Sequence, residues 1–191
     1  MTTSTKRQLP NGNDSKMKVV ITGHAFGIGA AIFEIFNANG LECVGYDIQN
    51  GKDLNNSQVV DELLLECQTS DIFINNALSN QAELLKKVHQ IWIGKNKIIV
   101  NISSAVTYFK NTHSDISENY IKHKQDLDLI CKELAIDQFP CIMNVRPSWV
   151  DTQLASHIED IKINTRDLAE LIYYHISNRE KYRVVDIVVV R

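Results

Sequence analysis

The sequence predicts an α/β fold in which a doubly wound, mostly parallel sheet is covered by helices on both faces. Short apolar runs alternate with amphipathic stretches along most of the chain, which is the pattern of repeated βαβ units. The runs are continuously apolar, as expected for strands that are buried on both faces. With 191 residues, 44% of them hydrophobic, the chain is long enough for one domain with a full core.

The predicted strands and helices follow one another in regular order. The first strand is β-branched and breaks at Gly23, and the helix after it ends at the stop signal Asn39-Gly40. Asn56 or Ser57 can cap the second helix. The strands are expected at residues 18–22, 42–47, 71–75, 97–102, 141–145 and 183–190. The helices are expected at residues 28–38, 59–67, 81–93, 117–135 and 166–177.

One predicted connection is unusually short. Only about a dozen residues separate Asp47 from Val59, which is too few for a strand and a full crossover helix. A short strand near residues 52–54 would have to follow the second strand through a loop alone. Residues 17–191 are otherwise expected to form a single domain. Residues 1–16 are polar and without periodicity, and they are expected to form a flexible tail.

The composition argues against several classes of function. A formal net charge of -3 gives no global attraction to nucleic acid or to an anionic membrane. The longest apolar runs are much shorter than the roughly 18–20 residues of a membrane span. The four cysteines form no C-x-x-C pair and have no histidines at metal spacing. We therefore expect reduced thiols, no metal site and, in the absence of a secretory signal, a cytoplasmic location.

A glycine-rich turn follows the first predicted strand and opens the first predicted helix. Its sequence from residue 22 is TGHAFGIG. Gly23 permits a tight turn, Gly27 lets a pyrophosphate approach the backbone, and Gly29 lets the helix pack closely. The helix N-terminus offers N–H groups and a positive dipole end to phosphates. The turn therefore predicts a Rossmann-type dinucleotide-binding domain, the alternative being a turn that only joins strand to helix.

The end of the second predicted strand carries a carboxylate. Asp47 lies 24 residues after Gly23, where a carboxylate can accept hydrogen bonds from the adenosine ribose and would repel a 2′-phosphate. Neither the glycine turn nor the residues directly after Asp47 include Lys or Arg. The sequence therefore favours NAD(H) over NADP(H), unless Asp47 only caps a loop.

The spacing of the glycine turn, T-G-x-x-x-G-x-G, resembles the short-chain dehydrogenase/reductase family, and four later segments agree in order. They are NNAL at 75–78 for N-N-A-G, NISS at 101–104 for N-x-S-S, YIKHK at 120–124 for Y-x-x-x-K and NVRPSWVDT at 144–152 for N-x-x-P-G-x-x-x-T. The resemblance runs from Lys18 to about Thr152. It implies a Rossmann-type fold and NAD(P)-dependent hydride transfer on an alcohol or carbonyl.

The resemblance also implies a set of cofactor contacts. Residues 147–152 would hold the nicotinamide carboxamide. Asp53-Leu54 resembles the family's D-[VIL] step beside the adenine, although Asp53 equally suits a cap on the next helix. The implied cofactor-binding residues are Gly23, Phe26, Gly27, Ile28, Gly29, Asp47, Asp53, Leu54, Asn76, Ala77, Tyr120, Lys124, Pro147, Val150 and Thr152.

Ser104, Tyr120 and Lys124 are the implied catalytic residues. Tyr120 and Lys124 are four apart and share a helix face, so we expect the ammonium to lower the pKa of the phenol. By resemblance, Tyr120 exchanges a proton with the substrate oxygen, Lys124 tunes Tyr120 and binds the nicotinamide ribose, and Ser104 orients the oxygen. Ser103 and Tyr108 are alternatives, although Tyr108 has no lysine four residues later. An ordinary amphipathic helix with an exposed lysine is the other interpretation.

The chain departs from the family pattern in three places. In the 28 positions from Asn76 to Ser104 the family's catalytic Asn has no evident counterpart. Ser148 replaces a glycine, and only 13 residues between Thr152 and Arg166 are left for a lid over the substrate. These departures bear on turnover more than on cofactor binding.

Three functions remain open from the sequence. The first is an NAD(H)-dependent alcohol or carbonyl oxidoreductase acting on a small molecule, with sugars and nucleotide sugars among the candidates. The second is a catalytically weak relative that binds NAD(H) as a sensor or interaction module. The third is an α/β domain that binds no nucleotide. The family's pairing through the Y-x-x-x-K helix implies a homodimer or tetramer, whereas the apolar residues of 117–135 fit a partner or a monomer core equally.

Overall fold

The computed structural model describes residues 16–109 and 116–191, and the predicted elements lie close to their expected positions. Six strands are present: β1 (Lys18–Thr22), β2 (Glu42–Tyr46), β3 (Ile72–Asn75), β4 (Ile98–Ile102), β5 (Cys141–Pro147) and β6 (Asp186–Val189). Five α-helices are present: α1 (Gly27–Ala38), α2 (Ser57–Thr69), α3 (Gln81–Trp92), α4 (Glu118–Leu134) and α5 (Thr165–Ser177). The tail expected for residues 1–16 lies, except for its last residue, outside the described residues.

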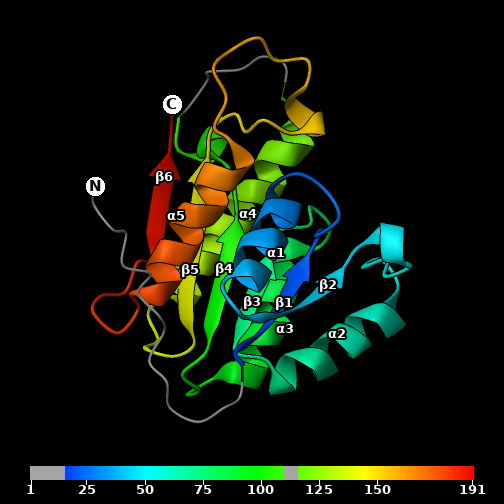
Figure 1. Ribbon diagram of the computed structural model, residues 1–191, viewed down its shortest axis with the longest axis vertical. Helices are drawn as coiled ribbons and strands as arrows, with labels where there is room; N and C mark the ends of the chain where they lie inside the picture. Colours follow the sequence, from blue (N-terminus) through cyan, green and yellow to red (C-terminus); the bar gives the residue numbers. More distant parts are fainter. Residues whose placement is uncertain (1–15, 110–115) are drawn as a thin grey trace.

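The strands form one sheet in the order β2-β1-β3-β4-β5-β6, and every neighbouring pair is parallel. The predicted α/β class is therefore confirmed (Figure 1). The chain passes from β1 to β2 on one side and then returns to place β3 on the other side of β1. Ligands of such sheets bind beyond the carboxyl ends of the strands, at the point where this reversal occurs.

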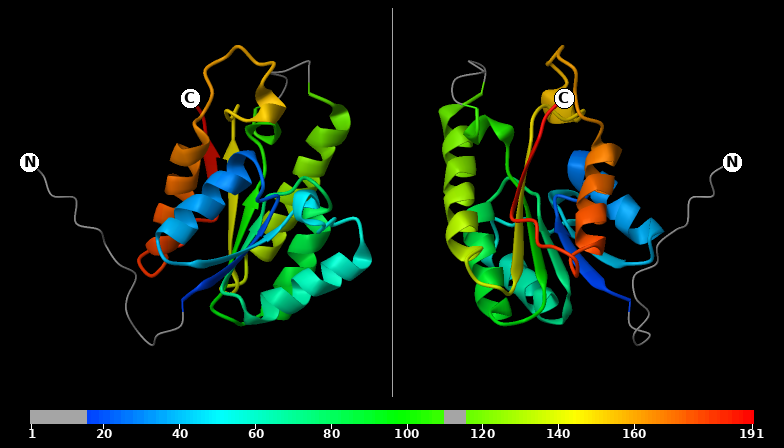
Figure 2. Two further views of the ribbon diagram at one scale, coloured as in Figure 1. Left: turned by 45° about the vertical axis from the view of Figure 1, so that its right-hand side comes forward. Right: turned by 90° about the vertical axis from the view of Figure 1, so that its left-hand side faces the viewer.

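The two faces of the sheet have separate hydrophobic cores. Helices α1 and α5 cover one face, and α2, α3 and α4 cover the other (Figure 2). Consecutive residues of β1 serve both cores, because side chains of a strand point alternately to its two faces. Val19 and Ile21 pack with Phe36 and Ile172, whereas Val20 packs with Leu63, and all are buried. The continuously apolar strands of the sequence are explained by this double burial.

The short connection after β2 contains no strand. Asp47 caps a single 3-10 turn, η1 (Ile48–Asn50), and the chain then runs directly into α2, whose N-cap is Asn56. The carboxylate of Asp53 accepts the N–H of Asn55 at 2.9 Å, so it stabilises the turn before the helix. The strand considered near residues 52–54 is therefore wrong. The dozen residues available are used by η1 and this turn, which leaves β2 at the edge of the sheet.

Three asparagines lie in register across the sheet, toward the carboxyl ends of β3 and β4 and in the middle of β5. Asn75 pairs with Asn101, and Asn101 pairs with Asn144. All three are buried on the face that α3 and α4 cover. Buried amides require hydrogen-bond partners, and this polar row lies directly beneath the helices that carry the site.

The structure bears on three further expectations, which concern the thiols, a membrane span and a metal site. All four cysteines are free, Cys67 and Cys131 fully buried and the other two partly so. Among the described residues, none of the helices combines the length and apolar character that crossing a bilayer requires. The same residues contain no group of three or more metal-ligating side chains.

Candidate functional site

The turn between β1 and α1 depends on two glycines. Gly23 has a φ of +68°, a left-handed conformation that glycine adopts without strain. Gly29 lies so close to the turn that an added Cβ would be 2.0 Å from the Gly23 carbonyl oxygen and 2.7 Å from Asn76 Nδ2. No side chain fits there. The helix therefore approaches the turn closely at Gly29, as the glycine at this position predicted.

A polar staple joins this turn to the end of β3. Asn76 Nδ2 donates to the carbonyl oxygens of Thr22 and Gly23, at 3.1 and 3.0 Å. The hydroxyl of Thr22 accepts the backbone N–H groups of Asn76 and Ala77, at 2.9 and 3.0 Å. The T-G segment after β1 and the N-N-A segment after β3 therefore hold each other in place.

The N-terminus of α1 has no side-chain cap. The N-cap residue, Phe26, makes no capping hydrogen bond, and the first turn contains no acidic residue. The first N–H groups of a helix have no partner within it, and the dipole makes this end positive. An anion such as a pyrophosphate can therefore bind here.

The residues proposed for the adenosine end lie around the turn rather than in the main cavity. Asp47 Oδ2 accepts the N–H of Ala25 at 3.3 Å, and its Oδ1 accepts the N–H of Gln49 at 2.9 Å. The carboxylate thus both caps η1 and contacts the glycine turn. Leu54 is buried in the same core cluster as Val59, and its contact with the adenine stays a prediction.

A cavity of about 2000 Å³ lies at the carboxyl edge of the sheet. Ten residues implicated by the sequence line it: Phe26, Gly27, Ile28, Asn76, Ser104, Tyr120, Lys124, Pro147, Val150 and Thr152. Six do not: Gly23, Gly29, Asp47, Asp53, Leu54 and Ala77. The cavity brings the start of α1, the ends of β4 and β5 and the first turns of α4 together, although they are far apart in the sequence.

Ser104 and Tyr120 meet at this cavity. Ser104 follows β4 and caps the 3-10 turn η2 (Ala105–Thr107), and it is hydrogen-bonded to the side chain of Tyr120 on α4. Burial raises the pKa of Tyr120, and the hydrogen bond with Ser104 partly opposes this. The expectation that Lys124 would lower the pKa of the phenol is therefore wrong for the protein alone. The ammonium lies over the ring, 5.6 Å from its centroid, and the cost of burying a phenolate outweighs it.

Lys124 is buried, and its ammonium donates two hydrogen bonds. Its Nζ donates to Gln81 Oε1 and to the carbonyl oxygen of Ile102, each at 2.7 Å. Burial lowers the pKa of Lys124 to about 8, and the nearby carboxylate of Asp128 opposes the shift. The interpretation of Lys124 as an exposed residue of an amphipathic helix is wrong, since its relative exposure is 4%.

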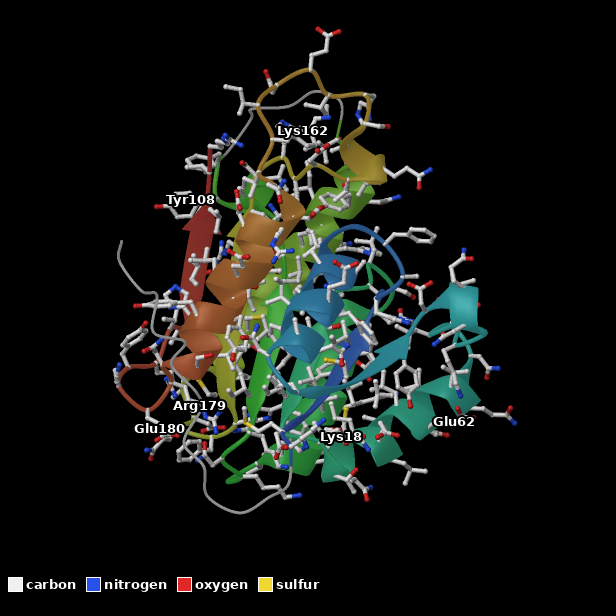
Figure 3. All side chains as sticks on the ribbon, viewed as in Figure 1. Lys18, Glu62, Tyr108, Lys162, Arg179 and Glu180 are labelled. Atoms are coloured by element: carbon white, nitrogen blue, oxygen red, sulfur yellow. The ribbon has the colours of Figure 1, made fainter. Side chains whose placement is uncertain are left out.

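The two alternative residues have different surroundings. Ser103 also lines the cavity, but it is buried and its Oγ donates to Asp128 Oδ1 at 2.6 Å rather than to Tyr120. Tyr108 is 61% exposed and packs edge-on against Phe109. Figure 3 places it toward the β6 side of the molecule, and it is absent from the cavity lining. Among these candidates, the structure therefore groups Ser104 and Tyr120 with Lys124.

A buried ionic cluster continues beyond Lys124 along α4. Asp128, one turn after Lys124, accepts hydrogen bonds from Ser103 Oγ at 2.6 Å and from Asn144 Nδ2 at 2.8 Å. Arg146 Nη1 lies 3.3 Å from the second carboxylate oxygen, and Arg146 Nη2 pairs with Asp186 of β6 at 2.8 Å. Sequence reasoning missed this cluster and Gln81. The i, i+4 repeat from Lys124 to Asp128 was the available signal, whereas nothing marked Gln81.

The segment after β5 closes the other side of the cavity. Val150 forms a parallel bridge with Ile163, and Ser148 donates its N–H to the carbonyl oxygen of Val189 at 2.8 Å. Thr152 lies next to the glycine turn, since a Cβ on Gly27 would be 3.1 Å from Thr152 Cγ2. The P-S-W-V-D-T segment and the glycine turn thus form two walls of one cavity.

Neither a protein-family model nor a curated protein matches the chain. Solved structures do match it. A short-chain dehydrogenase/reductase described as SDR:Glucose/ribitol dehydrogenase from Brucella melitensis has a TM-score of 0.76 and 14% identity, over 92% of this chain and 94% of that one. A 3-ketoacyl-(acyl-carrier-protein) reductase from the same organism, complexed with NADH, has a TM-score of 0.74 and 16% identity, over 91% and 96%.

A third similar structure carries a different cofactor. An alcohol dehydrogenase from the archaeon Thermococcus sibiricus, complexed with 5-hydroxy-NADP, has a TM-score of 0.70 and 14% identity, over 92% of this chain and 96% of that one. The resemblance to the short-chain dehydrogenase/reductases predicted from the sequence is therefore confirmed in the fold. Since the relatives carry both NADH and an NADP derivative, they indicate no preference between the two.

Proposed function

We propose that this chain, which has the fold of the short-chain dehydrogenase/reductases, is an NAD(H)-dependent oxidoreductase that interconverts an alcohol and a carbonyl compound. One observation carries the proposal. Ser104, Tyr120 and Lys124 line the same cavity as the uncapped N-terminus of α1. A domain that only folds, or only binds a nucleotide, has no need for a hydroxyl, a phenol and a buried ammonium together at that place.

The cavity and the glycine turn fit a nicotinamide dinucleotide. The backbone from Phe26 to Gly29 would bind the pyrophosphate, and residues 147–152 would hold the nicotinamide end. Gly23, Asn76 and Ala77 would support the turn through the hydrogen bonds described above. When bound, the nicotinamide supplies the hydride acceptor or donor. The size of the cavity, about 2000 Å³, leaves room for a small-molecule substrate beside it.

In this proposal Tyr120 transfers a proton and Ser104 orients the substrate oxygen. Because burial raises its pKa, the phenol of Tyr120 is protonated at neutral pH and is able to donate a proton. The hydrogen bond to Ser104 fixes its hydroxyl at the cavity. Lys124 places a positive charge against the ring, which stabilises a developing phenolate, and it would bind the nicotinamide ribose.

The preference for NAD(H) rests on Asp47. Its carboxylate contacts the glycine turn through Ala25, so a 2′-phosphate at this place would meet a negative charge. Lys52, the next basic residue in the sequence, is paired with Glu62 and is not available to neutralise it. Asp53 is a supporting residue of the same loop.

Fluorescence titrations of NADH and NADPH into the purified protein, with the Asp47→Ala variant alongside, test this assignment. We expect NADH to bind tighter than NADPH and the variant to lose most of that preference, because the repulsive charge is gone. Asp61→Ala, which removes an exposed carboxylate from α2 and leaves the Lys52–Glu62 pair intact, is the matched control and should keep the preference. Binding of neither dinucleotide would contradict the proposal and favour a domain that binds no nucleotide.

A catalytically weak relative that binds NAD(H) as a sensor is the second candidate. The raised pKa of Tyr120 favours it, since a phenol that resists ionisation is a poor base in alcohol oxidation. The two candidates share the cofactor site and differ in turnover. A sugar or nucleotide sugar stays among the possible substrates.

Assembly and location complete the proposal. We expect a homodimer or tetramer that pairs through α4. Leu127 and Ile130 belong to the core, whereas Leu129 is 57% exposed on the outer side of the helix, where a partner would bury it. The four free cysteines support a reducing compartment such as the cytoplasm.

A further inference from the structure

The ammonium of Lys124 is held by a residue to which the sequence assigned no role. Gln81 is the first residue of α3 and is 5% exposed. Its Oε1 accepts a hydrogen bond from Lys124 Nζ at 2.7 Å, and the carbonyl oxygen of Ile102 accepts a second one at the same distance. Both acceptors are neutral. They satisfy two of the three donors of the ammonium, while Lys124 lines the cavity.

The amide of Gln81 has one possible orientation. Its Nε2 donates to the carbonyl oxygens of Asn75 at 2.8 Å and of Ile102 at 3.1 Å. A flipped amide would turn its oxygen toward those two carbonyls and its NH₂ group toward the ammonium, and all three contacts would become repulsive. Oε1 is therefore the atom that faces Lys124.

The backbone of Gln81 is fixed as firmly as its side chain. Asn75 Nδ2 donates to the carbonyl oxygen of Gln81 at 2.8 Å and to Asn101 Oδ1 at 2.9 Å. Asn75 and Gln81 therefore bind each other in both directions, side chain to backbone. This clamp connects the row of buried asparagines to Lys124, so the acceptor cannot move away from the ammonium without breaking several buried hydrogen bonds.

We propose that Gln81 is a positioning residue, which fixes the ammonium of Lys124 over the ring of Tyr120 and keeps it protonated. The geometric part of this inference stands without a cofactor. Its consequence for proton transfer rests on the proposed function. Gln81 touches neither substrate nor Tyr120 in this arrangement and acts only through Lys124.

The charges around Lys124 explain why a neutral acceptor matters. Tyr120 and Asp128 flank it on α4, and Asp128 is itself neutralised by Arg146 of β5, which also pairs with Asp186 of β6. Within the described residues, helix α3 carries the titratable side chains of Glu83, Lys86, Lys87 and His89, none of which accepts a hydrogen bond from Lys124. His89 lies at the other end of the helix, 3.5 Å from Asp137. Burial disfavours the ammonium, and the hydrogen bonds that it donates to Gln81 and Ile102 offset part of that penalty.

The test is an NMR titration of the lysine side chains in protein labelled with ¹³C-lysine, and it requires neither cofactor nor substrate. Lys124→Met assigns the resonance of Lys124. Gln81→Leu removes the acceptor at nearly the same volume, and Gln81→Glu keeps an acceptor and adds a charge. Gln90→Leu, the same change at an exposed position of α3, is the matched control.

We expect the titration midpoint of Lys124 to fall by about one to two pH units in Gln81→Leu, the worth of one hydrogen bond to a charged group. It should rise in Gln81→Glu and stay unchanged in Gln90→Leu. An unchanged midpoint in both Gln81 variants would overturn the inference. If Gln81→Leu does not fold, Gln81→Glu decides alone, and a midpoint at or below that of the wild type would overturn it.

A second measurement separates this inference from the proposed function. If NADH binds the wild type, we expect weaker binding by Gln81→Leu at pH 8 and restored binding by Gln81→Glu. If NADH binds no form of the protein, the proposed function fails, and the titration of Lys124 still decides whether Gln81 positions it.

Discussion

Two polar structures at the carboxyl edge of the sheet are built in opposite ways. The glycine turn is formed by eight consecutive residues, 22–29, and is held mainly by backbone groups and by the staple from Asn76. The Lys124 cluster, made of Lys124, Gln81, Ile102 and Asp128, joins the start of α3, the end of β4 and the middle of α4 through three side chains and the carbonyl oxygen of Ile102. One structure requires that side chains be absent, and the other requires that particular side chains meet.

The difference shows what each structure contributes. The turn is a rigid anion site whose geometry leaves little freedom, because a Cβ at Gly29 has no space. In the cluster, the protonation state of Lys124 depends on the burial of its ammonium. Burial lowers the pKa of Lys124 to about 8, against the effect of Asp128, which places the charge change of a lysine near the working range of a cell. Substitutions in the turn should therefore alter stability at every pH, whereas those in the cluster should act in a pH-dependent way.

The largest effect on stability is expected from Gly29→Ala. The added Cβ would lie 2.0 Å from a backbone oxygen, so the turn has to open and the staple from Asn76 is strained. We expect a loss of about 3 kcal/mol or more in the free energy of unfolding, measured by urea titration, and the same loss at all pH values.

Gly40→Ala is the matched control for this change. Gly40 has a φ of +84° but nothing within 4 Å of its added Cβ, so only the cost of a left-handed alanine applies, about 1 kcal/mol. If Gly29→Ala is no more destabilising than Gly40→Ala, the close packing of the turn plays no part in stability.

A smaller and pH-dependent effect is expected from Lys124→Met. The pKa of Lys124 falls from the ordinary 10.5 to about 8 on folding, so between these values the unfolded chain binds more protons than the folded one. Wild-type stability therefore gains from this group as the pH rises from 8 to 10.5, and the gain is lost as the pH falls to 8. Methionine has no charge and shows no such gain.

Urea titrations of both proteins from pH 7 to pH 10.5 measure this effect. The free energy of unfolding of Lys124→Met minus that of the wild type should decrease by about 3 kcal/mol over the range. The buried tyrosines and cysteines with raised pKa values titrate in both proteins and largely cancel in the difference. A difference that is independent of pH would mean that the ammonium of Lys124 is solvated rather than buried.

The same contrast explains what the sequence could and could not predict. The strands and helices were predictable because apolar periodicity, caps and glycine stops are local signals, and the turn was predictable because its glycines are adjacent in sequence. The edge position of β2 was not, since the turns at Asp47 and Asp53 take up the room for another strand. The direction of the pKa shift of Tyr120 was predicted wrongly, because the sequence shows the nearby lysine but not the burial that outweighs it.

Gln81 shows most clearly which contacts the sequence could not predict. Gln81 is 43 residues from Lys124 in sequence, and its importance arises from the short path between β3 and α3 that turns its side chain inward. No spacing rule connects the two residues. By contrast, Tyr120 and Lys124 share a helix face, so their proximity follows from the helix alone.

The central claim is that Tyr120 transfers the proton in an NADH-dependent reaction at this cavity. The most direct test is NADH oxidation with a panel of carbonyl compounds, comparing the wild type, Tyr120→Phe and, as the matched control at an exposed position, Tyr108→Phe. We predict that Tyr120→Phe lowers turnover by about 10²- to 10⁴-fold with NADH affinity retained, while Tyr108→Phe behaves as the wild type. Full turnover by Tyr120→Phe would contradict the claim. A wild type that binds NADH but oxidises none of it would also contradict the claim, and it would favour the NAD(H)-binding sensor.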